Sequence, residues 1–171
     1  RGVYLLSLCI IINLCLGFTY AWSVFQIPIQ KFFGWNLTQT SLAFSIIVAL
    51  SSFGQIIAGC LLKKILPWKI IASGGLLCAI GVGGMGFMQS TPELYIASVA
   101  FGLGIALVFP STVYNMVWYF PKKRGMVTGL LAAGSGAGAI IWAPLGDKLI
   151  DNIGLLETFK LYGALFLLII S

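Results

Sequence analysis

Long stretches without a charged residue constrain this sequence more than any other feature. Five of them reach the length of a membrane-spanning helix and a sixth begins later: residues 2–30, 32–62, 70–92, 94–121, 126–146 and from 161 onward. An α-helix needs about 20 mainly apolar residues to cross the hydrocarbon core of a bilayer. Helices satisfy their backbone hydrogen bonds within one segment, as lipid requires, and the strict alternation typical of barrel strands is absent.

The sequence therefore predicts an all-α polytopic membrane protein, built as a bundle of six transmembrane helices. Their expected bounds are residues 3–27, 39–62, 68–89, 93–118, 124–146 and 157–171, with the last helix continuing beyond the segment. The whole chain is expected to be one six-helix unit.

The composition also indicates a chain that faces lipid. Of the 171 residues, 60% are hydrophobic and 8% are charged, against about 25% charged residues in an average soluble domain. The net charge is +6, but nucleic acid is not an expected partner, because a nucleic-acid-binding face needs a polar scaffold. The four cysteines lie in apolar stretches and histidine is absent, so neither a metal site nor a disulfide framework is expected.

The positive charges predict the orientation of the bundle. Seven cations precede the first predicted helix or follow the second and fourth: Arg1, Lys63, Lys64, Lys69, Lys122, Lys123 and Arg124. The other three share the opposite side with all four acids: Lys31, Lys148, Lys160, Glu93, Asp147, Asp151 and Glu157. Because short cytoplasmic loops are enriched in Lys and Arg, we expect both ends of the segment to be cytoplasmic.

Four of the predicted helices carry uncharged polar side chains on one face. The first helix carries Asn13, Thr19, Tyr20, Ser23 and Gln26, with Trp22 on the far side, and the second carries Ser41, Ser45, Ser52 and Gln55. The fourth carries Ser111, Asn115 and Trp118, and the fifth carries Thr128, Ser135 and Trp142. Such groups face either an aqueous cavity or a neighbouring helix, and Ser and Thr can also bond their own backbone. No acid or base lies within these stretches, so neither a proton relay nor enzyme chemistry is indicated, and no cofactor is expected.

Two motifs give the chain a resemblance to a known family. The stretch GFTYAWSVFQIPI at residues 17–29 resembles the first helix of the oxalate:formate antiporter family. The stretch YFPKKRGMVTGLLAAGSGAG at residues 119–138 resembles a sequence that this family shares with the monocarboxylate transporters. With six helices and both ends on one side, the chain is similar to the amino-terminal half of a major facilitator superfamily transporter.

This resemblance implies a secondary carrier of small organic anions, in which two six-helix halves rock around a central site. The carboxyl-terminal half, which supplies a cation to the substrate in that family, is expected to be absent from this segment. The resemblance assigns substrate contacts to Thr19, Tyr20, Ser41, Phe109 and Ser135, and the polar face of the fourth helix adds Asn115. Thr19 and Ser41 replace glutamine of the oxalate exchanger, and Phe109 and Ser135 replace tyrosine. These departures favour a larger or more apolar carboxylate than oxalate.

The connections on the basic side depart from the superfamily pattern. In the sequence that begins at Gly59, Lys63 occupies the position of the acid that normally holds a cytoplasmic gate, and Lys122 replaces another acid before the fifth helix. We therefore expect Gly59, Lys63, Lys64, Lys123 and Arg124 to form a gate or topology signal without the usual ion pair. We expect these cations to pair either with acids of the absent half or with anionic lipid.

Two alternative functions remain open from the sequence. One is a major facilitator carrier of a neutral solute such as a sugar, and the other is a membrane sensor or scaffold that transports nothing. The leading expectation is an integral protein of the plasma membrane that moves mono- or dicarboxylates by exchange or symport.

Overall fold

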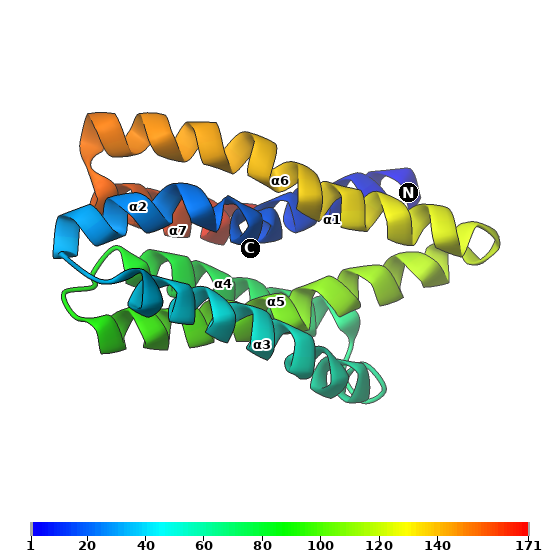
Figure 1. Cartoon of the computed structure of the whole chain (residues 1–171). Coiled ribbons are helices and arrows are strands. Elements are labelled where there is room, and N and C mark those ends of the chain that lie inside the picture. The colour runs from blue at the N-terminus through cyan, green and yellow to red at the C-terminus, as the bar shows by residue number, and fades with distance from the viewer. Residues whose placement is uncertain (1, 171) are drawn as a thin grey trace.

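The computed structural model describes residues 2–170 as helices that run lengthwise and are joined by short turns (Figure 1). The elements are α1 (Gly2–Leu16), the 3-10 helix η1 (Gly17–Ala21), α2 (Trp22–Phe33), α3 (Leu37–Leu61), α4 (Pro67–Met85), α5 (Thr91–Tyr119), the 3-10 helix η2 (Pro121–Lys123), α6 (Arg124–Ile153) and α7 (Leu155–Ile170). No strand occurs among the described residues. The predicted all-α fold is confirmed. Arg1 and Ser171, which belong to the predicted cation set and the sixth helix, lie outside the described residues.

Five helical stretches are long and apolar enough to cross a bilayer. They are Gly2–Phe33, Leu37–Leu61, Pro67–Met85, Thr91–Tyr119 and Pro121–Ile153. The sixth predicted helix corresponds to α7, which is described over 16 residues. A chain with this many apolar helices is an integral membrane protein.

Two helices extend further than the sequence predicts. The first stretch continues past residue 27 to Phe33, where Gly34 ends it in a left-handed conformation with φ 70°. The fifth continues past residue 146 to Ile153, where Gly154 ends it at φ 88°. Both predicted helices were limited to about the length that crosses the lipid, but a helix can continue beyond the lipid and expose charges to water.

The third predicted helix is shorter than expected. It was expected to reach residue 89, but α4 ends at Met85, and Gly86 and Phe87 form a turn. The glycines before this point have low helix propensity, and the turn is followed by a capping box at Ser90 and Glu93 that starts α5.

The helices form two layers in the view of Figure 1. One layer contains α3, α4 and α5, and the other contains α1, α2 and α6, with α7 behind α2. The turns between α3 and α4 and between α5 and α6 lie at one end of the bundle, and the other three turns lie at the opposite end. We call the first end the basic end, because Lys63, Lys64, Lys69, Lys122, Lys123 and Arg124 lie there.

Buried aromatic rings hold α7 against the first two helices. Phe18 lies at the centre, with its ring centroid 5.6 Å from that of Tyr162 and 5.0 Å from that of Phe25. The Tyr162 hydroxyl donates a hydrogen bond of 3.1 Å to the carbonyl of Trp142 on α6. A close approach at Gly83 and Gly163 joins α7 to α4, since a Cβ added at Gly163 would lie 2.5 Å from the Cα of Gly83. α7 therefore connects the two layers.

The closest contact between α6 and the first membrane span occurs at two glycines. A Cβ added at Gly17 would lie 2.6 Å from the Cα of Gly138, and one added at Gly138 would lie 2.7 Å from the Cα of Gly17. Real Cβ atoms do not approach backbone this closely, so both positions require glycine. One turn further along α6, the Trp142 indole N–H donates a hydrogen bond of 2.7 Å to the carbonyl of Leu14.

Substituting Gly138 by valine should destabilise the bundle, because the added side chain forces α6 away from η1. Overpacking of this kind costs about 1–3 kcal/mol. The matched control is Gly136→Val on the same helix, where an added Cβ would meet nothing within 4 Å. Thermal denaturation of the purified full-length protein in detergent should show a lowered Tm for Gly138→Val and little change for Gly136→Val. Equal effects of the two substitutions would contradict the proposed backbone contact.

Candidate central groove

Two adjoining hollows lie between the layers and together form what we call the central groove. The first has a volume of about 310 Å³ and is lined from the first span, α3, α5 and α6 by Leu16, Thr19, Tyr20, Phe44, Val48, Ser51, Ser52, Gln55, Ile105, Phe109, Ala132 and Ser135. The second has a volume of about 280 Å³ and is lined by Thr19, Tyr20, Trp22, Ser23, Gln26, Ser41, Phe44 and Ser45. Thr19, Tyr20 and Phe44 line both hollows.

Five of the six residues that the sequence analysis assigned to a substrate site lie along this groove. Thr19, Tyr20, Phe109 and Ser135 line the first hollow, and Ser41 joins Thr19 and Tyr20 in the second. They come from four elements that are distant in the sequence. The structure therefore brings them together on one surface.

Asn115 lies apart from the other five residues. It lines a separate groove with Pro67, Tyr114, Trp118 and Tyr119 near the basic end of α5. Asn115 follows Phe109 by six residues, which is about 1.7 helical turns, so the two side chains leave α5 in different directions. Phe109 was predicted from the resemblance and Asn115 from the polar face of the helix, but the two side chains do not share a face of α5.

The hydroxyl groups of the groove are mostly engaged with their own helices. Thr19 donates to the carbonyl of Leu16 at 3.0 Å, and Ser45 donates to that of Ser41 at 3.0 Å. Ser51 and Ser52 both donate to the carbonyl of Val48, at 2.9 and 2.8 Å. Their oxygens can still accept a hydrogen bond, but their protons are in use.

Fewer donors remain for a ligand than the sequence pattern suggests. The Tyr20 phenol and the Gln55 amide have no hydrogen-bond partner among residues 2–170, and Tyr20 is 64% exposed. Ser135 is buried, and its hydroxyl also lacks a partner among these residues. The Ser41 hydroxyl accepts a bond of 2.9 Å from Gln26, which leaves its own proton available. Each of these donors is uncharged.

No charged side chain lines either hollow. Apolar and aromatic side chains form the rest of the walls, chiefly Phe44, Val48, Ile105 and Phe109. A groove of this composition can solvate a small polar group through hydrogen bonds and cover an apolar group beside it. It cannot neutralise an anion by itself.

Amide and hydroxyl groups connect α2 to α3 at the end of the groove away from the basic end. Gln26 donates to Thr40 at 3.2 Å as well as to Ser41, and Gln30 donates to Thr40 at 3.0 Å. Thr40 is fully buried. Gln30 and Thr40 were not predicted as polar groups of this region, although the spacing of Gln26 and Gln30 by four residues places both amides on one face of a helix.

Trp22 lines the second hollow, although the sequence analysis placed it on the far side of its helix. Its indole nitrogen is buried and has no partner among the described residues. The direction of Trp22 differs because Gly17–Ala21 is a 3-10 helix. Such a helix turns about its axis by about 120° per residue, whereas an α-helix turns by about 100°. Over five residues this adds about 100° of rotation, so a continuous α-helical count gives the wrong direction for Trp22.

Other residues of the predicted polar faces serve packing. Trp142 bonds Leu14, as described above, and Thr128 donates to the carbonyl of Arg124 at 2.9 Å. Asn13 is fully buried and donates to the Thr112 hydroxyl at 3.0 Å, which joins α1 to α5. Of the three α6 residues in the predicted stripe, only Ser135 reaches the groove.

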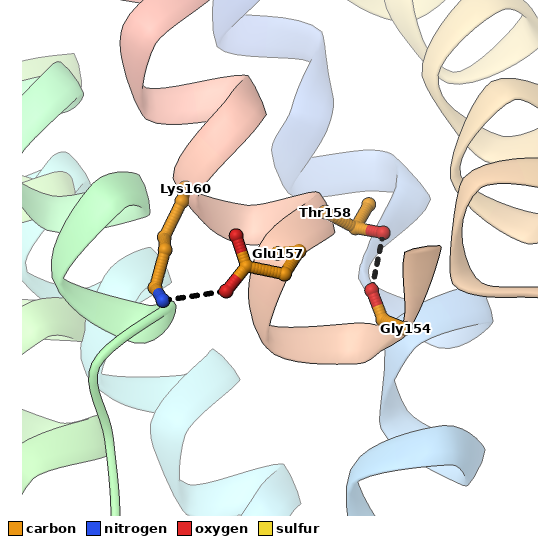
Figure 2. A network of polar contacts seen from close by, with 4 residues as sticks. All are labelled: Gly154, Glu157, Thr158 and Lys160. Atoms are coloured by element: carbon orange, nitrogen blue, oxygen red, sulfur yellow. Dashed lines mark hydrogen bonds and ion pairs between the residues drawn. The ribbon is translucent and has the colours of Figure 1, made fainter. Parts of the chain in front are cut away.

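The residues expected at a gate are all exposed at the basic end. They are Gly59, Lys63, Lys64, Lys123 and Arg124. A Cβ added at Gly59 would meet nothing within 4 Å, so packing within residues 2–170 does not require glycine there. The one ion pair among the described residues joins Lys160 and Glu157 at 2.7 Å, at the opposite end (Figure 2). Within the described part of the chain, no three His, Cys, Asp or Glu side chains gather in a group that could hold a metal ion.

Comparisons with known proteins identify the family of the chain. The model of the Major Facilitator Superfamily matches residues 6–171. The chain is 26% identical to the oxalate:formate antiporter of Oxalobacter formigenes, over 95% of this chain and 39% of that protein. It is 33% identical to monocarboxylate transporter 4 of Rattus norvegicus, over 93% of this chain and 34% of that protein. It is 31% identical to monocarboxylate transporter 3 of Mus musculus, over 97% of this chain and 34% of that protein.

The chain thus spans between a third and two fifths of the length of these relatives. The family match covers nearly all of the chain, and the all-helical bundle is consistent with it. The chain belongs to the Major Facilitator Superfamily.

Proposed function

We propose that this chain forms one half of a secondary transporter that moves small organic anions across the plasma membrane by alternating access. The central groove carries this proposal: four separate elements line it, and its free hydrogen-bond donors are all neutral. The named activities of the relatives, oxalate:formate exchange and monocarboxylate transport, give the class of substrate. Because those relatives are longer, further chain is expected to close the groove from the opposite side.

The donors of the groove suit a carboxylate. Tyr20 of η1 and Ser135 of α6 offer hydroxyl protons in the first hollow, and Gln55 offers amide protons on α3. A carboxylate accepts several such bonds, and hydrogen bonds to a charged group are stronger than those between neutral groups. The negative charge then requires a cation from outside the described residues, which we assign to the second half of the transporter.

The walls of the groove favour a substrate with an apolar part. Phe44, Val48, Ile105 and Phe109 are positioned to cover a short hydrocarbon group beside the carboxylate. Oxalate has no such group. We therefore propose a monocarboxylate with an aliphatic or small aromatic substituent as the preferred substrate.

The packing supports movement of this half as a rigid body. The buried aromatic cluster around Phe18 and the glycine contact between Gly17 and Gly138 join elements of the first span to α6 and α7. Close-packed interiors deform little, so such a bundle rocks as one unit instead of bending. For the orientation, we propose that the basic end lies on the cytoplasmic side, because short cytoplasmic loops are rich in Lys and Arg.

Transport by the full-length protein in proteoliposomes tests the proposal directly. We expect uptake of radiolabelled lactate or butyrate to exceed uptake of oxalate, because only the former place an apolar group against the groove wall. Glucose provides the neutral control. Flux of glucose without flux of any carboxylate would favour a carrier of neutral solutes, and binding without flux would favour a sensor; either result contradicts the proposed function.

Removal of groove donors should weaken substrate binding. Tyr20→Phe and Ser135→Ala should each raise the KM for the transported carboxylate about tenfold or more, because a hydrogen bond to a charged group contributes about 1.5–3 kcal/mol. Ser73→Ala is the matched control, since Ser73 bonds the carbonyl of Ile70 on α4 and does not line the groove. A KM unchanged in both groove variants would exclude these hydroxyls from substrate recognition.

Cysteine labelling tests the orientation. In a Cys60→Ser background, a cysteine at Lys122 should react with a membrane-impermeant maleimide only in inside-out vesicles. A cysteine at Lys148 should react only in right-side-out vesicles, because Lys122 lies in η2 just before α6 and Lys148 lies near the opposite end of α6. The reverse pattern would show that the basic end is extracytoplasmic.

A further inference from the structure

A second groove lies at the basic end of α5 and has no part in the central groove. Two hollows flank the side chains of Tyr114 and Trp118. One, of about 410 Å³, is also lined by Pro67, Asn115 and Tyr119. The other, of about 400 Å³, is also lined by Val117, Pro121 and Arg124. We call this pair of hollows the basic-end groove.

The basic-end groove faces away from the central groove. The two grooves share no lining residue. Trp118 follows Phe109 by nine residues, which is about 2.5 helical turns, so these side chains leave opposite sides of α5. Phe109 lines the central groove. The face with Trp118 is therefore the outer face of α5.

Exposed apolar residues continue this outer face along α5. Ile96, Leu103 and Tyr114 are exposed, and their spacings of seven and eleven residues keep them on the same side of the helix as Trp118. In a membrane-spanning helix such a side contacts hydrocarbon chains. The stripe thus leads from the basic-end groove towards the middle of the bilayer.

Aromatic residues place the basic-end groove at the depth of lipid headgroups. Trp118 is 72% exposed and Trp68, at the start of α4, is 62% exposed. Tyr119 and Tyr114 are exposed beside them. Trp and Tyr concentrate where the hydrocarbon core meets water, because their rings are apolar and their N–H or O–H groups are polar. The Lys69 ammonium lies 5.6 Å from the centre of the Trp68 ring, which brings a positive charge to the same level.

Six positive charges surround this end of the bundle without an acid. Lys63, Lys64 and Lys69 come from the α3–α4 connection and the first turn of α4, and Lys122, Lys123 and Arg124 come from η2 and the start of α6. All six are exposed, and Figure 1 shows both connections at the same end. The four acids of the chain belong to the elements at the other end: Glu93, Asp147, Asp151 and Glu157. None of the six cations forms an ion pair within residues 2–170.

We propose that the basic-end groove binds an anionic phospholipid. The phosphate lies beside Arg124 and the neighbouring lysines, the headgroup packs between the rings of Tyr114 and Trp118, and one acyl chain follows the outer face of α5. Clusters of four to eight basic residues next to a membrane helix attract anionic lipids in this way. The site requires neither the proposed substrate nor the proposed direction of transport, because it depends only on the outer surface of the bundle.

A lipid fits this surface better than an acidic protein segment. The groove lies on the side of α5 opposite to the central groove, whereas a second half that closes the central groove would approach from the groove side. The combination of exposed Trp side chains with an apolar stripe matches a molecule that has both a charged headgroup and a hydrocarbon chain.

Native mass spectrometry of the full-length protein in mixed micelles tests this site. The micelles contain equal amounts of dioleoylphosphatidylglycerol and dioleoylphosphatidylcholine, which differ in headgroup charge but carry the same acyl chains. We expect the wild type to retain phosphatidylglycerol about tenfold more than phosphatidylcholine. The double variant Lys122→Gln/Lys123→Gln and the single variant Arg124→Gln should lose most of this preference.

Two further variants separate a defined site from general charge attraction. Lys31→Gln/Lys148→Gln removes the same number of charges from the opposite end and should keep the preference for phosphatidylglycerol. Trp118→Leu preserves every charge and should lower phosphatidylglycerol retention at least threefold by opening the groove. Equal retention of the two lipids by the wild type, equal losses in both lysine double variants, or an unchanged preference in Trp118→Leu would each overturn the proposal.

Discussion

The contact between Gly17 and Gly138 determines the arrangement of the groove. Because neither residue has a side chain, η1 and α6 approach to the distance of backbone contact, and the residues on either side are fixed as a result. Thr19 and Tyr20 follow Gly17, and Ser135 precedes Gly138 by one helical turn. The same contact brings the Trp142 indole to the carbonyl of Leu14. A wider separation at this point would move Thr19 and Tyr20 away from Ser135, so that these residues would no longer line the same groove.

The groove gains its polarity without placing a charge in the membrane. Most of its Ser and Thr hydroxyls donate to carbonyls of their own helices, so these residues can be inserted into lipid without an unsatisfied proton. A small set of donors stays available, led by Tyr20 and Gln55. This division explains how four apolar helices can carry polar faces and still remain stable in a bilayer.

Charge spacing was sufficient to predict the all-α fold, the five membrane-length helical stretches and the basic end, because the cost of burying a charge in lipid exceeds local propensities. Five of the six predicted site residues line the central groove, and their contact with a substrate stays a prediction. Trp22 was misplaced because nothing in the sequence marks Gly17–Ala21 as a 3-10 segment. Asn115 was included because it is polar, while its direction depends on the packing of α5. The helix end at Ile153 was missed because it lies beyond the apolar stretch, and the end at Met85 was missed because the turn at Gly86 and Phe87 lies within an uncharged stretch.

The burial of the thiols has a practical consequence for observing motion. Cys9, Cys15 and Cys78 lie inside the bundle, whereas Cys60 is exposed in the last turn of α3, next to Gly59 at the basic end. Within this chain, a spin label or a fluorophore would therefore attach selectively at Cys60. Its distance to a second label elsewhere in the full-length protein would follow the opening and closing of the basic end without any engineered thiol in this half.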